Sequence, residues 1–378
     1  MPFTGNTYTG PAGSTNATAG QVVQSAIWNA IHGDLATALT TLMTQANTNA
    51  PGFQNVMAPN GSFLIWQRGL SIAVPASTIA YTADRWYLAT GATEASIVAA
   101  VADLSAGATP NCAAKVTRNS GQTGTAVVSF GYPFDTDEIY RMRGSLLSFS
   151  CAVKSGANWS PASGTLTVTV AFGTGSVGKR VNGFTAETVV LTIPTNLAVS
   201  SPRTVISGTS TVIVPVNSGQ GEVQFTWTPS GTAGADDSIS IDECCLVTGS
   251  LIQSFTDIPF QTSLDMCKRH YQKTFPYATA PAQNAGTQGA LSLISATSKV
   301  GLFWKFADEM RAAPWAITTY SPGGATANWY DLTGGVSLVT VVDVTNSGST
   351  MGIMLYSAAT AAAADHLIYL HADANASI

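Results

Sequence analysis

Short apolar segments between residues 53 and 275 are separated by clusters of Gly, Pro, Asn and Asp, and no helical period intervenes. Several of them alternate apolar residues with Ser or Thr, which is typical of strands in a sheet with one face toward solvent. The expected strands are Ala126–Phe130, Leu146–Val153, Leu166–Phe172, Val189–Ile193, Val212–Val216, Val223–Trp227 and Ile239–Leu246. Strands of this length with turn signals between them predict a sandwich or barrel, and a jelly roll is the natural candidate.

A second group of apolar segments lies beyond residue 288. Residues 276–288 are rich in Pro, Gly, Ala and Asn, which predicts a linker, and Leu264–Lys273 before it favours a short helix. The further strands are expected at Ala290–Ala296, Val300–Phe306, Ala316–Tyr320, Val336–Val344, Gly352–Ser357 and Leu367–Ala372. The sequence therefore predicts a mainly β chain, with a jelly-roll β-sandwich at 53–275 and a smaller C-terminal β-sandwich at 289–378.

The first 52 residues have a different pattern. Residues 1–20 are mostly Gly, Thr, Ser, Asn and Pro, a composition that cannot bury a core alone, so we expect an extended segment that docks onto a partner. An amphipathic helix is expected over about residues 19–47, and residues 21–52 are assigned to an oligomerisation segment that contains most of it. The positions of its apolar stripe are Trp28, Ile31, Leu35, Ala38 and Leu42. This helix either joins subunits in a bundle or packs on its own chain.

The chain carries few charges for its length. Of 378 residues, 45% are hydrophobic and only 10% are charged, so Ser, Thr, Asn, Gly and Ala must fill the solvent-facing positions. This suits an extracellular particle protein whose surface is partly buried between subunits. The net charge of −5 argues against nucleic acid, whose binding needs clustered Lys and Arg. We also expect no secretory signal, because MPFTGNTYTG has no positively charged start followed by an apolar run, and no membrane insertion, because no apolar run is long enough to span a bilayer.

The cysteines at 112, 151, 244, 245 and 267 are expected to be free thiols. Their number is odd, and Cys244 and Cys245 are neighbours, which is poor geometry for a disulfide. No C-x-x-C spacing indicates a zinc site. Buried thiols are consistent with a chain that folds in a reducing cytoplasm.

Two short motifs formally match catalytic or cofactor patterns. Gly173–Gly178 satisfies G-x-G-x-x-G, but turn signals follow it in place of a helix, so we interpret it as a glycine-rich hairpin loop. Asp135, Asp137 and Glu138 could supply paired carboxylates for glycoside hydrolysis, but a solvated loop before the strand at Leu146 is the favoured interpretation. We therefore expect neither enzymatic activity nor a cofactor.

Two segments, Asn60–Trp86 and Ile239–Phe275, resemble the opening and closing parts of a jelly-roll module of bacteriophage tail-fibre and receptor-binding proteins, which is similar to carbohydrate-binding modules. The matching runs are Gly61–Gly69 (GSFLIWQRG), Tyr81–Trp86 (YTADRW) and Cys267–Lys273 (CKRHYQK). In addition, residues 310–322 (MRAAPWAITTYSP) resemble the run that opens the terminal β domain of many phage fibre proteins.

The resemblance implies a function as a phage fibre or spike adhesin. Such a protein would be a homotrimer, would attach to other virion proteins through its N-terminus, and would bind a host surface polysaccharide. It would be assembled in the bacterial cytoplasm and released by lysis as part of the virion. Two alternatives stay open: a purely structural virion component of the tail, baseplate or head, and a polysaccharide-degrading spike.

Metal binding is weakly indicated at two places. Related carbohydrate-binding jelly rolls often hold a structural calcium with acidic residues on the first strand, but here those positions are Ser62 and Leu64. That leaves Asp242, with Glu243, as the candidate on the last strand. His371 and Asp373 lie two apart on the expected final strand and could bind a metal in a trimer, although a surface-facing strand end is the simpler interpretation.

The aromatic residues divide into core and surface candidates. Trp66 and Trp86 lie in the runs that carry the resemblance and are expected in the core. The run Tyr320–Leu332 contains two glycines, two aromatic rings and an acid, which favours an exposed loop, and loops on a rigid β scaffold often carry function. The predicted glycan-binding residues are Trp329, Tyr330, Asp331, Tyr320 and Asn328.

Overall fold

The computed structural model describes residues 3–4, 7–8, 32–35, 37, 55–101, 113–295, 301–339, 341–342, 349–356 and 363–378. The chain consists of two compact units, Met1–Gln54 and Asn55–Ile378. In the first unit, β1 (Phe3–Thr4) pairs antiparallel with β2 (Thr7–Tyr8). Residues 32–35 are helical, as predicted, and the side chain of Leu35 is 43% exposed. The other predicted stripe residues, Trp28, Ile31, Ala38 and Leu42, lie outside the described residues.

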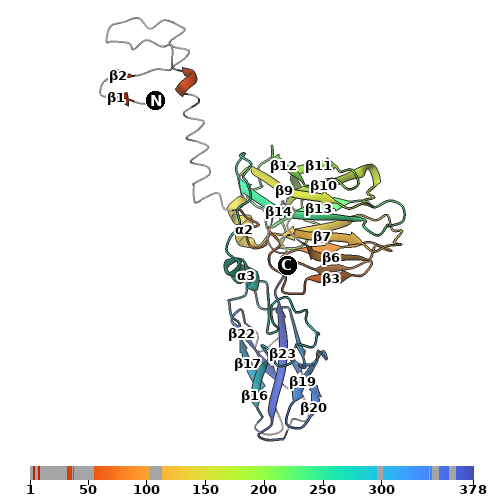
Figure 1. The fold of residues 1–378 in the computed structure, drawn as a ribbon. Helices are drawn as coiled ribbons and strands as arrows, with labels where there is room; N and C mark the ends of the chain where they lie inside the picture. Colours follow the sequence, from red (N-terminus) through yellow and green to blue (C-terminus); the bar gives the residue numbers. More distant parts are fainter. Residues whose placement is uncertain are drawn as a thin grey trace, which may run out of the picture. The chain divides into compact units, whose positions relative to one another are not determined.

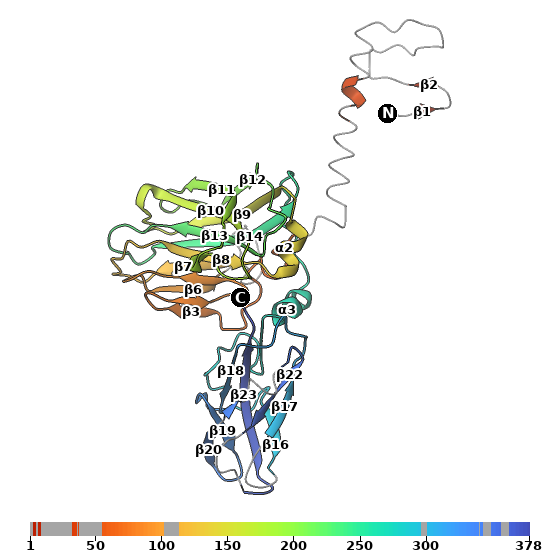
Figure 2. The same cartoon turned by 180° about the vertical axis from the view of Figure 1, so that it is seen from behind.

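Residues 55–258 contain a sandwich of two six-stranded antiparallel sheets (Figures 1 and 2). One sheet has the order β11 (Thr188–Asn196), β10 (Thr165–Gly173), β13 (Gln220–Trp227), β8 (Val128–Pro133), β5 (Tyr87–Ala89), β4 (Ile79–Tyr81). The other has the order β12 (Thr204–Thr209), β9 (Leu147–Ser155), β14 (Ser238–Thr248), β7 (Ala113–Arg118), β6 (Ser96–Val101), β3 (Ser71–Val74). The predicted β-sandwich is confirmed.

Alternation along the strands builds the core between the two sheets. On β10, Leu166, Val168, Val170 and Phe172 point inward, and the Thr residues between them point outward. The ring of Trp86 lies at the centre of this core, with its centroid 4.8 Å from that of Phe130 and 4.7 Å from that of Phe63. Trp66 is buried in the same core. The prediction that Trp66 and Trp86 are core residues is confirmed.

One predicted strand of the sandwich is wrong. Val212–Val216 is a continuous apolar run, but its Pro215 has no N–H to donate to a neighbouring strand. The segment bends instead, and Val214 exchanges backbone hydrogen bonds with Gly144 and Ser145 in the loop before β9. A loop contact therefore satisfies the backbone of this run in place of a sheet.

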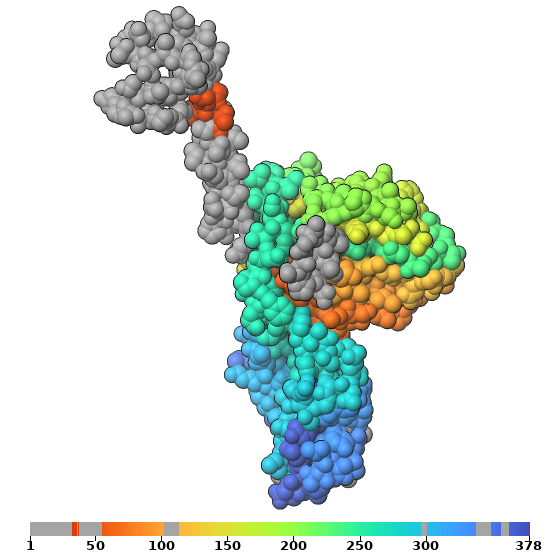
Figure 3. Space-filling model, in the orientation of Figure 1, coloured from red at the N-terminus to blue at the C-terminus, as the bar shows by residue number. Residues whose placement is uncertain are grey.

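The second β block begins after helix α3 (Phe260–Lys268). Its larger sheet has the order β15 (Tyr271–Lys273), β23 (Leu367–Asn375), β19 (Asn328–Asp331), β20 (Val336–Val339), and β16 (Leu291–Ile294) and β18 (Ala316–Tyr320) also pair with β23. Its smaller sheet has the order β17 (Gly301–Lys305), β22 (Gly352–Tyr356), β21 (Val341–Val342). In Figure 3 this block forms the cyan-to-blue surface, which adjoins the orange-to-green surface of the sandwich. Its core includes Trp304, Trp329, Ile353, Leu355 and Leu370.

The conspicuous polar residues of the Gly61–Gly69 and Tyr81–Trp86 runs are buried where the second block meets the sandwich. The Asp84 carboxylate accepts hydrogen bonds from the Gln67 backbone N–H (2.7 Å) and side-chain amide (2.9 Å). That amide also donates to the Tyr271 carbonyl at 2.9 Å. Arg68 lies 3.8 Å from the centroid of the Tyr271 ring and donates to Ser377 Oγ at 3.1 Å. These residues hold the fold together and are not available to a ligand.

The acidic cluster after β8 begins a helix. Asp135 is the N-cap of α2 (Thr136–Met142), and its carboxylate accepts from the Thr136 N–H at 2.7 Å. Glu138 completes a capping box by accepting from the Asp135 N–H, and it forms an ion pair with Arg85 at 2.8 Å. The predicted solvated loop is therefore wrong, and these carboxylates stabilise a helix terminus.

The G-x-G-x-x-G run lies in the loop between β10 and β11, as predicted. This loop, residues 174–187, is called the strap because it is bound across the outward side of β13. Gln220, Glu222 and Gln224 accept hydrogen bonds from the Gly175 N–H (3.2 Å), the Arg180 N–H (2.8 Å) and the Arg180 guanidinium (2.8 Å), respectively. A Cβ atom at Gly175 would lie 2.9 Å from Gln220 Oε1, so glycine permits the close approach.

Burial of Glu222 beneath the strap predicts a pH-dependent stability. Burial raises its pKa to about 7, and hydrogen bonds from Tyr87 and Arg180 only partly oppose this. Because the pKa of Glu222 in the folded state lies above its value in the unfolded state, its contribution to stability is fully present below about pH 4.5 and is lost as the pH rises through 7. We therefore compare the free energy of unfolding of the wild type with that of Glu222→Gln. The wild type should gain about 3 kcal/mol relative to the variant when the pH is lowered from 8 to 4. Urea unfolding of both proteins between pH 4 and pH 8 measures this difference. If the free energies of unfolding of the two proteins changed with pH in parallel, the prediction would be contradicted.

The described cysteines agree with the sequence prediction. Cys151, Cys244, Cys245 and Cys267 are free and buried, and Cys112 lies outside the described residues. Burial raises the pKa of Cys245 to about 11 and that of Cys267 well above its usual value. Cys245 and Cys267 therefore remain protonated, and the buried thiols pack as small apolar side chains. In the described part of the chain, no helix is long and apolar enough to cross a membrane.

Candidate functional site: a charged groove beside helix α3

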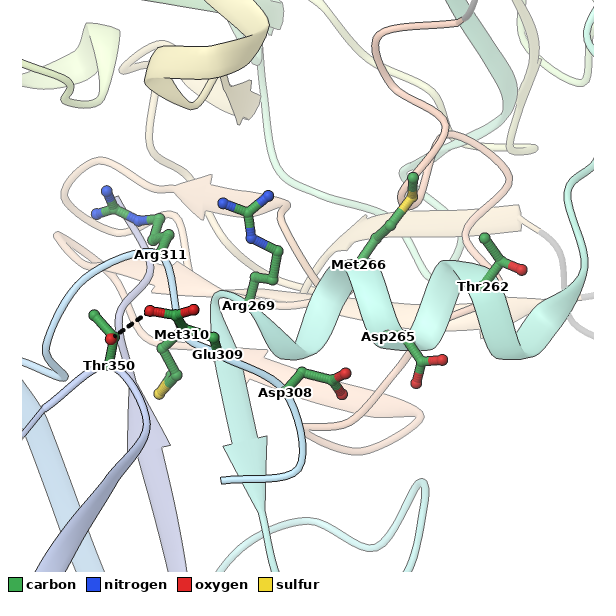
Figure 4. A pocket seen from close by; sticks show the side chains of 9 residues that line it. All are labelled: Thr262, Asp265, Met266, Arg269, Asp308, Glu309, Met310, Arg311 and Thr350. Carbon is green, nitrogen blue, oxygen red and sulfur yellow. Dashed lines mark hydrogen bonds between the residues drawn. The ribbon is translucent and has the colours of Figure 1, made fainter. Parts of the chain in front are cut away.

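A groove of about 660 Å³ opens between helix α3 and the second β block (Figure 4). One wall is the face of α3 and its C-cap, where lining residues recur with spacings of three and four along the helix. The facing wall is the segment 308–311 after β17, and Thr350 before β22 closes one end. The lining residues are Thr262, Asp265, Met266, Arg269, Asp308, Glu309, Met310, Arg311 and Thr350.

The two walls of the groove are tied to each other. Lys268 Nζ donates to Asp265 Oδ1 at 2.9 Å and lies 3.4 Å from Asp308 Oδ2 on the opposite wall. The Arg311 N–H donates to the Arg269 carbonyl at 2.8 Å. These contacts cross between the helix and the facing segment, so the groove is formed before any ligand enters.

The charged groups of the groove are held in defined orientations. Thr350 Oγ1 donates to Glu309 Oε1 at 2.8 Å, as the dashed line in Figure 4 shows. Arg311 Nε donates to the Ala376 carbonyl at 2.6 Å. The hydrogen bond from Lys268 lowers the pKa of Asp265, so this carboxylate is ionised at neutral pH. An ionised carboxylate accepts hydrogen bonds and is not suited to protonate a leaving group.

Arg269 is the most accessible cation of the groove. It is the C-cap of α3, and its side chain is 48% exposed. The nearest carboxylate is Asp137, with Nη2 3.8 Å from Oδ2, which is a loose pair between two exposed groups. The guanidinium group of Arg269 therefore keeps most of its hydrogen-bond donors available for a ligand.

The predicted aromatic glycan site is not an exposed loop. Trp329 and Asp331 lie on β19 and are 0% and 1% exposed, because residues two apart on a strand share a face and this face meets the core. Asp331 accepts from the Gly334 N–H and contacts His366 Nδ1, each at 2.7 Å. Tyr320 is buried and donates to Asp373 at 3.2 Å. A sugar cannot stack on Trp329 in this fold.

The other two residues of that prediction are only partly accessible. Asn328 and Tyr330 lie on the opposite face of β19 and are half-buried. Asn328 donates to the Thr326 carbonyl at 3.0 Å. The structure thus places Tyr320 on β18 and the other four predicted residues on both faces of β19, and it does not gather the five into one surface site.

The metal candidates are bonded to protein groups. His371 is fully buried, stacks on the Phe275 ring with centroids 4.2 Å apart, and has its two ring nitrogens near Thr274 Oγ1 (3.0 Å) and the Gly286 carbonyl (3.1 Å). The predicted surface-facing strand end is therefore wrong. Asp373 accepts from the Tyr271 hydroxyl at 3.1 Å.

The calcium candidates of the last sandwich strand also have protein partners. Asp242 is buried and accepts from the Glu243 N–H at 2.6 Å, and Glu243 forms an ion pair with Arg203. Among the residues that the structure describes, no group of three or more His, Cys, Asp and Glu side chains could hold a metal ion.

Sequence reasoning did not find the groove. Two signals for it were present: the polar residues Thr262, Asp265 and Arg269 recur on one helical face, and the charged pair Asp308 and Glu309 directly precedes the 310–322 run. Only the fold shows that these two segments face each other. The helix predicted over Leu264–Lys273 is also shifted, since α3 spans Phe260–Lys268 and a strand follows it.

No model of a known protein family matches the sequence, and no curated protein is significantly similar to it. Among solved structures, the enzymatically active domain of tailspike protein 4 from bacteriophage CBA120 is similar, at 12% identity and a TM-score of 0.31, over 52% of this chain and 21% of that chain. The CBM22-1 xylan-binding domain of Paenibacillus barcinonensis Xyn10C is similar at 16% identity and a TM-score of 0.30, over 47% and 99%.

A Stig cyclase, Fisc, from Fischerella sp. TAU is similar at 13% identity and a TM-score of 0.32, over 52% of this chain and 98% of that chain. The proteins matched thus include a binding domain and enzymes of different kinds. At such TM-scores the similarities carry no argument about function. The fold assignment therefore stands on the strand order and register described above.

Proposed function

We propose that this chain is a non-enzymatic adhesin of a phage virion and that it binds a host surface glycan in the charged groove beside α3. The observation that carries the proposal is the groove itself: about 660 Å³, open to solvent, and lined by charged side chains, of which Asp265, Glu309 and Arg311 are fixed before binding. Sugar hydroxyls both donate and accept hydrogen bonds, and charged partners strengthen them. Fixed partners also reduce the entropy lost on binding.

Binding without cleavage is supported by the chemistry of the groove. Glycoside hydrolysis needs one carboxyl group that stays protonated to act as a general acid. The hydrogen bond from Lys268 lowers the pKa of Asp265, which is the opposite of what such an acid requires. The groove contains ion pairs and two methionines, Met266 and Met310, which suit recognition.

Groove variants test this function directly. We expect Arg269→Ala and Asp265→Asn each to weaken binding of the purified protein to host cells by about tenfold or more, because a hydrogen bond to a charged group contributes about 1.5–3 kcal/mol. Arg141→Ala and Asp365→Asn are matched controls, since both residues are exposed and lie outside the groove. Circular dichroism checks that all four variants fold.

Each alternative function gives a different result in the same assay. Folded protein that binds no cells and no purified polysaccharide would indicate a purely architectural virion component. Release of reducing ends from a bound polysaccharide would indicate a degrading spike. Equal binding by the groove variants and the wild type would place the glycan site elsewhere.

The adhesin proposal includes a homotrimer that attaches to the particle through residues 1–20. The stripe from Trp28 to Leu42 supports it, because an apolar helical stripe needs a partner surface. We expect light scattering to give three times the mass of the 39.0 kDa chain. Replacing Leu35 and Leu42 together by Asp should dissociate it into folded monomers, and an intact oligomer would contradict the role of this helix.

A further inference from the structure

The charges of the groove include no excess of cations. Its lining has three carboxylates, Asp265, Asp308 and Glu309, and two guanidinium groups, Arg269 and Arg311. The side chains paired with these groups add one cation, Lys268, and two carboxylates, Asp135 and Asp137. An acidic sugar is attracted by a site with a net positive charge. Such attraction is missing here, and an acidic sugar would also lose part of its hydration on entry.

Two of the three cations, Lys268 and Arg311, are moreover already engaged, and only Arg269 keeps most of its donors free. Lys268 lies between Asp265 and Asp308. Arg311 donates to the Ala376 carbonyl, and its Nη1 lies 3.8 Å from Asp135 Oδ1. An anionic group on a ligand would have to compete with these partners, and it would meet carboxylates on both walls.

Donors and acceptors occupy different sides of the groove. Figure 4 shows the guanidinium groups of Arg269 and Arg311 on one side, whereas the carboxylates of Asp265, Asp308 and Glu309 lie on the other. A hydroxyl group can accept from a guanidinium and donate to a carboxylate at once. Adjacent hydroxyls of a sugar ring supply such groups in pairs, without introducing a charge.

We infer that the groove is specific for an uncharged, hydroxyl-rich segment of polysaccharide and rejects segments that carry carboxylate or phosphate. This inference rests on the proposed glycan-binding function and adds the ligand class. The ionised carboxylates act as hydrogen-bond acceptors for neutral sugars and as repulsive elements against acidic ones. Specificity then arises from repulsion as well as from attraction.

The test uses the full-length protein and a panel of purified bacterial surface polysaccharides, some uncharged and some containing uronic acid, together with the carboxyl-reduced form of each uronic-acid polymer. Each reduced form is a neutral match for its acidic parent. We expect binding to uncharged polymers to change less than about twofold between 50 mM and 500 mM salt, because screening acts on charged ligands. We also expect reduction of an acidic polymer to strengthen its binding.

Charge variants locate the effect in the groove. Asp308→Asn with Glu309→Gln leaves an excess of positive charge in the groove lining, and we expect binding of unreduced uronic-acid polymers to rise by about tenfold in this variant. The control variant Asp365→Asn with Glu187→Gln removes two carboxylates outside the groove and should not change the binding of these polymers. Preferential, salt-sensitive binding of acidic polymers by the wild type would overturn the inference and leave the glycan-binding function standing. Binding of no polymer by folded protein would overturn both.

Discussion

Replacing Trp329 by alanine should lower the free energy of unfolding by about 3–5 kcal/mol, because removal of a fully buried tryptophan would leave a cavity. Its ring is fully buried with Trp304, Ile353 and Leu355 in the core of that block. Chemical denaturation followed by far-UV circular dichroism measures the change. The method avoids tryptophan fluorescence, which the substitution itself alters.

Two controls separate burial from other effects of the Trp329 change. Trp329→Phe keeps most of the volume and removes an indole N–H that has no hydrogen-bond partner among the described residues, so its loss should be clearly smaller. Tyr330→Ala alters the next residue of β19, whose half-buried side chain faces the other way. A Trp329→Ala protein as stable as the wild type would show that the ring is not a core residue.

The position of Trp329 shows where sequence reasoning stops. Two glycines and a polar composition indicated an exposed loop over Tyr320–Leu332, but the four residues Asn328–Asp331 form a strand. Trp329 and Asp331 share one face of β19, so the burial of Trp329 also buries Asp331. A buried carboxylate needs a polar partner, and His366 is that partner, with its Nδ1 2.7 Å from Asp331 Oδ2. His366 is distant from Asp331 in the sequence, so this contact could not be predicted.

In the sandwich, the longest strands were predictable. β9, β10, β11, β13 and β14 each contain at least eight residues and were found, whereas the strands β3, β4, β5, β6, β7 and β12, of three to six residues, were missed. β3, β4 and β5 lie within and around the Gly61–Gly69 and Tyr81–Trp86 runs, whose polar residues form specific long-range contacts instead of an alternation. The groove was missed because Asp265 and Asp308 are 43 residues apart in sequence, and only tertiary structure brings them to face each other.

Replacing Arg118 by methionine should destabilise the sandwich by about 3–5 kcal/mol, because two buried carboxylates would lose their cation. Arg118 ends β7 and is almost completely buried. Its Nε donates to Glu94 Oε2 at 3.0 Å, and its Nη1 donates to Asp237 Oδ2 at 2.7 Å. Its Nη2 also donates to the Gly124 carbonyl at 3.1 Å, so a single side chain ties three loops to the end of a sheet.

The cost of the Arg118 change should arise from the unpaired charges and not from lost volume, since methionine is nearly as long. The combined variant Arg118→Met, Glu94→Gln and Asp237→Asn removes all three charges, and we expect it to recover part of the stability lost by Arg118→Met alone. Arg141→Met, at an exposed position, controls for the change in composition. A triple variant less stable than the single one would mean that the hydrogen-bond geometry of Glu94 and Asp237, more than their charge, holds these loops together.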